Sequence, residues 1–98
     1  MEGQLRAALE ALGSDPDDIA DALRAKEIKG VQRDECHCPI ANYLRLTVEG
    51  LDEVEAAQQW IWVDGEEYFR APPQIGSFIS RFDRGVYLDL VATEDGAQ

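Results

Sequence analysis

Apolar residues in the first half of the chain recur at the three- and four-residue spacing of amphipathic helices. A first helix over residues 4–12 is predicted by Leu5, Ala8, Leu9 and Leu12, and Gly13 ends it. A second helix should run from Pro16 to about Lys26, because Asp15 is a favourable N-cap and Pro16 suits the first helical position. We expect these two helices to form a short antiparallel pair.

The pattern then weakens before a third helix. Residues 28–31 are predicted to be extended, with an unusual backbone angle at Gly30, and the polar residues 32–38 to form a loop. The third helix should begin at Cys38 or Pro39 and end near Leu46. Its inward positions are Ile40, Tyr43, Leu44 and Thr47.

From residue 48 onward the pattern favours strands. A weak alternation predicts a strand over 54–57, and Trp60–Val63 is entirely aromatic or β-branched. Asp64-Gly65 is a strong hairpin signal, so Glu66–Arg70 should return as the partner strand. A two-residue turn would place Ile61, Val63 and Tyr68 on one face of the sheet. The other face would carry Trp60, Trp62 and Phe69.

The last part of the chain predicts one more helix. Ala71-Pro72-Pro73 ends the sheet, and Ile75, Phe78, Ile79 and Phe82 form an apolar stripe over about Pro73–Arg84, with Gly85 as the C-cap. Residues 86–91 should pack back as a short strand or irregular arm, and the final residues should fray. The expected fold is a single α+β domain over residues 1–98: N-terminal helices, a two- to three-stranded antiparallel meander with the Asp64-Gly65 hairpin, and a C-terminal helix.

Charge narrows the classes of partner. The 98 residues include 20 acidic and 9 basic side chains, which give a net charge of −11. So acidic a chain repels nucleic-acid phosphates, and direct nucleic-acid binding is disfavoured. A basic or nucleic-acid-binding protein is the better-matched partner, and spaced carboxylates also suggest a DNA mimic. A plain solvated surface is the simpler interpretation of the same charges.

The expected compartment is the cytoplasm. The first residues lack the basic and apolar regions of a signal peptide, and no apolar run approaches the ~20 residues that span a bilayer. A disulfide between Cys36 and Cys38 would close a strained ring, so we expect two thiols in a reducing compartment. No membrane partner is predicted.

Cys36, His37 and Cys38 are the candidates for chemistry, because they include both cysteines and the only histidine. They supply metal ligands, but structural zinc needs four, and no second cysteine or histidine pair follows. A helix N-terminus could activate the Cys38 thiol, but no third group marks a catalytic arrangement. The plainer interpretation is a helix start at Cys38-Pro39. We therefore predict no catalytic residue and no cofactor, and keep a metal or thiol site as an alternative.

Three segments carry a resemblance: Leu23–Gly30, Cys38–Arg45 and Phe78–Gly85. Together they look like small actinobacterial and actinophage-type proteins, a group without an established activity. The resemblance implies a compact stand-alone domain from a phage or mobile element. It identifies no catalytic residue, and it favours the helix-start interpretation of Cys38-Pro39.

The aromatic hairpin is the main functional hypothesis. A chain of 98 residues hardly suffices to cover both faces of the sheet, and exposed aromatic patches usually mark partners. We predict a partner-binding or homodimer surface made by Trp60, Trp62, Phe69, Glu66 and Glu67. The alternative is that the C-terminal helix covers one face and the N-terminal helices the other.

A winged-helix DNA-binding regulator is the remaining alternative. Its recognition helix would offer only Asn42 and Arg45 as polar readers, and the basic group Arg24, Lys26, Lys29 and Arg33 would meet phosphates. The stretch between the second and third helices is longer than the turn of a helix-turn-helix. The sequence therefore favours a non-enzymatic protein-interaction module.

Overall fold

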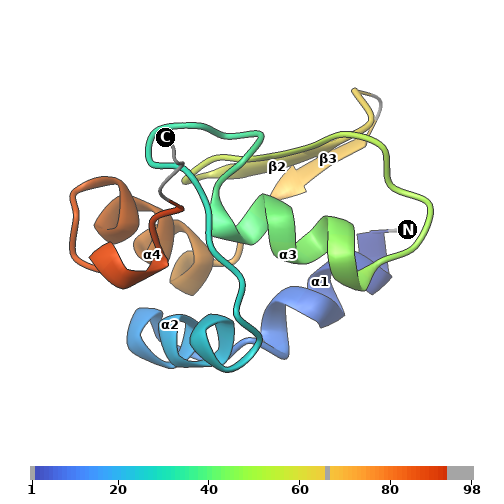
Figure 1. The fold of residues 1–98 in the computed structure, drawn as a ribbon. Coiled ribbons are helices and arrows are strands. Elements are labelled where there is room, and N and C mark those ends of the chain that lie inside the picture. Colours follow the sequence, from blue (N-terminus) through green and yellow to red (C-terminus); the bar gives the residue numbers. More distant parts are fainter. Residues whose placement is uncertain (1, 66, 93–98) are drawn as a thin grey trace.

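A computed structural model describes residues 2–65 and 67–92. The elements in chain order are α1 (Glu2–Glu10), α2 (Pro16–Ala25), α3 (Pro39–Thr47), β1 (Val54–Ala56), β2 (Trp60–Val63), β3 (Glu67–Arg70), α4 (Pro73–Asp83) and the 3-10 turn η1 (Leu88–Leu90). The strands form one antiparallel sheet in the order β1-β2-β3. Figure 1 shows α3 and α1 beneath the sheet, with α2 and α4 beyond one end of it. The predicted α+β fold is confirmed, and the meander has three strands.

Local capping fixes the helix starts that the sequence predicts. The Asp15 carboxylate accepts a hydrogen bond from the Asp18 N–H at 2.9 Å, and Pro16 opens α2. The Cys38 sulfur accepts from the Ala41 N–H at 3.5 Å, and Pro39 opens α3. Thr47, expected to face inward, is exposed instead.

The prediction of an unusual backbone angle at Gly30 is wrong, because the φ of Gly30 is not positive. The positive φ values in this segment occur instead at Glu27 and Arg33, both 58°. What requires glycine is close packing: a Cβ atom on Gly30 would lie 2.3 Å from the Pro39 nitrogen. Gly30 also forms an isolated parallel bridge with Val91, made by bonds of 2.9 Å from its N–H and 2.7 Å to its carbonyl. Of the two forms predicted for residues 86–91, the structure has the irregular arm, which contains the 3-10 turn η1. The frayed end predicted for the last residues lies outside the described residues.

The predicted register of the hairpin is wrong by one residue. Val63 lies opposite Glu67, and Ile61 lies opposite Phe69, so the connection contains three residues instead of two. Asp64 and Gly65 do have the positive φ values expected of a turn, 55° and 71°. The Asp64 carboxylate also accepts two backbone N–H groups, from Asp52 and Glu53 at 2.9 and 2.7 Å. These bonds hold the turn against the entrance to β1.

A slip of one residue exchanges the faces of a strand. The inner face of the sheet therefore carries five buried side chains: Val54, Ala56, Ile61, Val63 and Phe69. Helix α3 packs against β1 and α1 packs against α3, where the Tyr43 hydroxyl donates to the Ala8 carbonyl at 2.6 Å.

The same core continues away from the sheet, between α2, α4 and the C-terminal arm. Phe78 stacks on Phe82 and on Tyr87, with ring centroids 6.0 and 5.3 Å apart. The apolar stripe predicted for the C-terminal helix is buried, and Gly85 takes the positive φ of 90° expected after a helix end.

Candidate partner-binding site

The outer face of the sheet is left uncovered by the helices of residues 2–65 and 67–92, all of which lie on the other side of it or beyond its end (Figure 1). Alternation along the three strands places Glu55, Trp60, Trp62, Tyr68 and Arg70 on this face. The alternative in which helices cover both faces is therefore wrong.

Three rings form a continuous cluster here, which we call the aromatic face: Trp60, Trp62 and Tyr68. The Tyr68 ring lies between the two indoles, with its centroid 5.6 Å from that of Trp60 and 6.3 Å from that of Trp62. Tyr68 is 61% exposed, and both tryptophans are half-buried. Such ring pairs hold one another in place, so the cluster presents a firm apolar surface to solvent.

Charges of opposite sign border the aromatic face. On the β1 side, Glu55 lies directly opposite Trp62 on the neighbouring strand. On the β3 side, the Arg70 guanidinium carbon lies 5.9 Å from the Trp60 ring centroid. That distance is within the range of a cation–π contact, so Trp60 already binds one cationic side chain from the same molecule.

Of the predicted partner-binding residues, the structure brings Trp60 and Trp62 together and separates Phe69 from them. Phe69 points inward and is 5% exposed, with the Arg6 guanidinium carbon 4.8 Å from its ring centroid. Glu67 is exposed at the end of β3 opposite Val63, and Glu66 lies outside the described residues. Tyr68 takes the place expected of Phe69. The greater polarity of tyrosine was the sequence signal that could have distinguished the two registers.

The two edges of the sheet differ in their hydrogen bonding. Most of the backbone groups of β1 that point away from β2 have partners, although none is found for the Val54 N–H among the described residues. The Ala56 N–H donates to the Glu35 carbonyl at 2.9 Å. The Val54 carbonyl accepts from Arg45 at 3.4 Å, and the Cys38 thiol lies 3.8 Å from the Ala56 carbonyl. The loop before α3 and α3 itself thus close the β1 edge.

The β3 edge is open. Ala71 donates to the Gln59 carbonyl at 2.8 Å, and this bond sets the alternation along β3. Phe69 and Glu67 therefore bond toward β2, whereas the N–H and C=O groups of Tyr68 and Arg70 point away from it. Across the described part of the chain, those outward groups have no protein partner.

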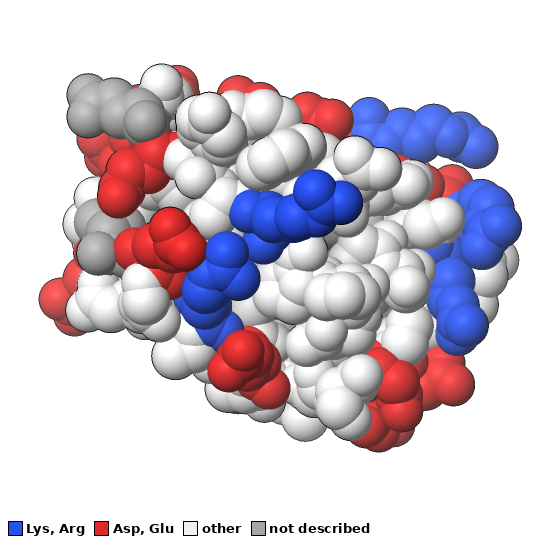
Figure 2. All heavy atoms as spheres, turned by 180° about the vertical axis from the view of Figure 1, so that it is seen from behind, with Lys and Arg blue, Asp and Glu red and all other residues white. Residues whose placement is uncertain are grey.

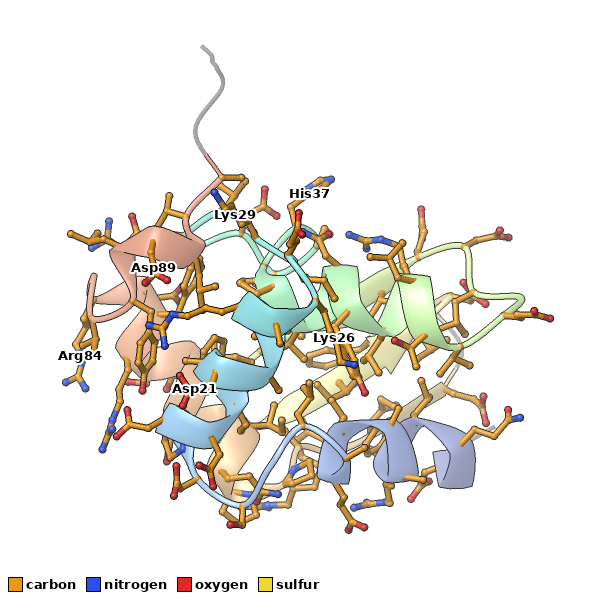
Figure 3. The ribbon with its side chains drawn as sticks, turned by 60° about the horizontal axis from the view of Figure 1, so that its bottom comes forward. Asp21, Lys26, Lys29, His37, Arg84 and Asp89 are labelled. Atoms are coloured by element: carbon orange, nitrogen blue, oxygen red, sulfur yellow. The ribbon has the colours of Figure 1, made fainter. Side chains whose placement is uncertain are left out.

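The cysteine and histidine candidates do not converge. Cys36 is exposed and Cys38 is buried, while the His37 ring is bonded to Asp34, with Nδ1 3.0 Å from the carboxylate. Figure 3 shows His37 pointing outward from its loop. In the part of the chain that the structure describes, no three His, Cys, Asp or Glu side chains are grouped as metal ligands.

Neither thiol has the lowered pKa of a nucleophile. Burial raises the pKa of Cys38 to about 11, which outweighs the hydrogen bonds from the N-terminal amides of α3. Partial desolvation raises the pKa of Cys36 as well, and the charges of Glu55 and Asp34 add to that effect. Both thiols therefore stay protonated at neutral pH, whereas the reactive form of a cysteine is the thiolate.

Asp34 orders this loop. Desolvation works in the opposite direction, but the hydrogen bonds from the His37 ring and the Cys36 N–H hold the pKa of Asp34 below its usual value. Its carboxylate accepts from the Cys36 and His37 N–H groups at 3.0 and 3.2 Å. The stretch is therefore a capped turn that leads into α3.

The polar residues of the proposed recognition helix are engaged inside the molecule. The Asn42 amide donates to the Lys29 and His37 carbonyls at 2.7 and 3.1 Å, and Arg45 bonds to the Asn42 oxygen and to the Val54 carbonyl. Arg24, from the basic group, bonds to Asp89 at 2.5 and 3.1 Å and to Asp21 at 2.8 Å. Figure 3 places those two carboxylates on α2 and on the C-terminal turn.

The surface charge is mixed. On the side opposite to that of Figure 1, acidic side chains lie mainly around the margin, while uncharged residues and a few basic side chains fill the centre (Figure 2). A cleft of about 380 Å³ lies near one end of the sheet, lined by Cys38, Gln58, Trp60, Ile79 and Asp83 among others. Trp60 thus borders both the aromatic face and this cleft.

Comparisons with protein-family models, with curated proteins and with solved structures gave no match, so the resemblance to actinobacterial and actinophage-type proteins stays a prediction. Within residues 2–65 and 67–92, every helix is too short or too polar to cross a membrane.

Proposed function

We propose that this protein is a non-enzymatic interaction module that binds a basic partner protein through the aromatic face. The observation that carries the proposal is the contact of Trp60, Trp62 and Tyr68 on a sheet face that the described helices leave open. Holding large rings in water costs free energy, whereas their burial against a partner is favourable. Aromatic residues are also the most frequent energetic centres of protein interfaces.

Charge selects the kind of partner. The chain has a net charge of −11, and Glu55 lies directly opposite Trp62 on the neighbouring strand of the sheet. A lysine or arginine side chain from the partner can place its stem on these rings and its charged head near Glu55. The contact of Arg70 with Trp60 is an example of the same chemistry within the chain. Long-range attraction would raise the rate of encounter, and the rings would provide specificity.

The test is a titration of tryptophan fluorescence with a lysine- and arginine-rich peptide, compared with an acidic peptide of equal length. We expect Trp62→Ala to weaken binding about tenfold or more, as for a residue at the centre of an interface. Glu55→Gln should weaken it less and reduce its dependence on salt.

The matched control is Leu46→Ala, because Leu46 is an apolar residue on α3 that is 76% exposed and lies away from the aromatic face. If Leu46→Ala and Trp62→Ala have equal effects, the peptide is held only by general charge attraction and the proposal is wrong. Thermal unfolding of each variant separates lost binding from a lost fold.

A further inference from the structure

We infer that the open β3 edge pairs with the β3 edge of a second copy of this chain, in an antiparallel arrangement about a two-fold axis. This edge shares Tyr68 with the aromatic face but uses the backbone groups of β3, and the inference does not depend on the binding of a basic partner. It begins from the difference between the two edges. The Glu35 carbonyl and the side chains of Cys38 and Arg45 occupy most of the β1 edge, whereas the outward groups of Tyr68 and Arg70 are free among the described residues.

An exposed edge strand is a template for another strand, because its backbone donors and acceptors lie in a row at the correct spacing. Four such groups lie on β3, namely the N–H and C=O of Tyr68 and of Arg70. Two antiparallel β3 strands can satisfy all of them when Tyr68 lies opposite Arg70 of the second copy, and Arg70 opposite its Tyr68. Each of these two residue pairs exchanges both backbone bonds.

The side chains favour this register over its neighbours. Tyr68 and Arg70 both project from the outer face, so the pairing sets a ring beside a guanidinium on each side of the axis. A shift of two residues in one direction would instead place Arg70 opposite its own copy, where like charges repel. The opposite shift would place Tyr68 opposite itself and leave Arg70 beyond the paired strands. The strand is thus complementary to itself in one register.

The arrangement has a consequence for the aromatic face. A two-fold axis perpendicular to the sheet keeps both outer faces on the same side. The dimer would therefore present one six-stranded sheet with two copies of Trp60, Trp62 and Tyr68. The net charge of −11 on each chain opposes this association, so we expect it to be weak at low ionic strength and stronger when salt screens the repulsion.

The first measurement is sedimentation velocity of the intact chain, up to millimolar concentration, in about 0.5 M salt where charge screening is nearly complete. We expect a reversible dimer. A monomer over the whole range overturns the inference. Hydrogen exchange on the same samples should show slower exchange of the Tyr68 and Arg70 amides in the concentrated one, and equal exchange at both concentrations would also contradict it.

Two substitutions at one position test the register. Tyr68→Lys places an ammonium opposite Arg70 of the second copy, and should raise the dissociation constant about tenfold or more. Tyr68→Glu places a carboxylate there, and should leave the dissociation constant unchanged or lower it. General repulsion between acidic chains predicts the reverse order, since lysine makes the chain less acidic and glutamate more so. That reverse order would overturn the inference.

A third variant separates the edge from the face. Trp62→Ala removes a ring from the aromatic face and leaves the β3 backbone unchanged, so dimerisation should persist. If Trp62→Ala abolishes dimerisation, the copies associate through their aromatic faces and the inference is wrong. Tyr68 is 61% exposed, so substitutions there should leave the fold intact, as circular dichroism can verify. If they do not, the hydrogen-exchange result on the unaltered chain decides.

Discussion

Ile61 and Trp62 are neighbours on β2, yet Ile61 is fully buried beneath the sheet and Trp62 remains half-exposed above it. The same contrast separates Phe69 from Tyr68 on β3. The inner face meets α1 and α3, so its aliphatic and phenyl side chains lose nearly all contact with water. The outer face meets none of the described helices, and its largest apolar groups touch mainly one another.

This difference shows that hydrophobicity alone does not decide which side of a sheet is buried. The two tryptophans offer more apolar surface than any inner residue, but the helices cover the opposite side. A chain that needed only a stable core would gain from polar residues on the uncovered face. We propose an intermolecular contact for these rings, and the following substitutions test whether the outer face contributes to folding.

The largest difference in stability is expected between alanine substitutions at Phe69 and at Tyr68. Phe69→Ala removes a buried ring from the inner face and should lower the free energy of unfolding by about 3–5 kcal/mol. Tyr68→Ala removes an exposed ring from the outer face and should cost less than about 1 kcal/mol. Chemical denaturation of both variants measures the difference. Equal losses would mean that the outer face also belongs to the core, and the contrast between the faces would fail.

Gly30→Ala should weaken the packing of α3, the helix that covers the inner face of the sheet. The new methyl group would lie 2.3 Å from the Pro39 nitrogen, so the start of α3 must move away from the segment that contains Gly30. We expect a loss of about 1–3 kcal/mol, as for other overpacked sites. Gly3→Ala is the control, since nothing lies within 4 Å of the added atom there. Near-equal melting temperatures for the two variants would contradict the close approach.

Asp64 holds the register that assigns each residue to its face. Asp64→Ala removes the acceptor of two backbone bonds and places alanine at a φ of 55°, which alanine tolerates poorly. We expect a loss of about 1–2 kcal/mol. Asp64→Asn keeps an oxygen acceptor and tolerates this conformation, so it should retain most of the stability. A shift in tryptophan fluorescence for the alanine variant alone would indicate that the sheet register has changed.

The smallest effect on stability should come from the substitution Asp89→Asn. Asp89 lies away from the sheet and accepts a hydrogen bond from Arg24 of α2. The hydrogen bond from Arg24 lowers the pKa of Asp89. A carboxylate with a lowered pKa stabilises the fold above its ordinary pKa, and this contribution is lost as the pH falls through the lowered value. Asp89→Asn should therefore melt slightly below the unaltered chain at neutral pH. The gap should narrow progressively as the pH falls below about 4, and a gap that is constant with pH would contradict the ion pair.

The elements that the sequence predicted correctly are those with local causes. The start of α2 depends on Asp15 and Pro16, and the start of α3 on Cys38 and Pro39, which are adjacent in the chain. The stripe of α4 likewise repeats within one segment. Each of these signals is complete within a few residues, and none of them depends on how distant segments meet.

The register and the covered face depend on distant segments, and here sequence reasoning failed or left alternatives. Asp64-Gly65 indicated a two-residue turn, but the Asp64 carboxylate bonds to Asp52 and Glu53 at the entrance to another strand. That contact cannot be read from the hairpin itself. Once the register moves by one residue, Phe69 and Tyr68 exchange faces, so one tertiary bond pattern decides the composition of the candidate site.

The closed edge at β1 sets a limit on assembly. A sheet with two open edges can add copies at both ends and grow into a filament, whereas a sheet with one open edge is a terminating unit. In this chain the Glu35 carbonyl and the Arg45 side chain occupy the edge at which a third copy would have to join. Association by strand addition at β3 would therefore end at two chains, because the β1 edge offers no comparable row of free backbone groups.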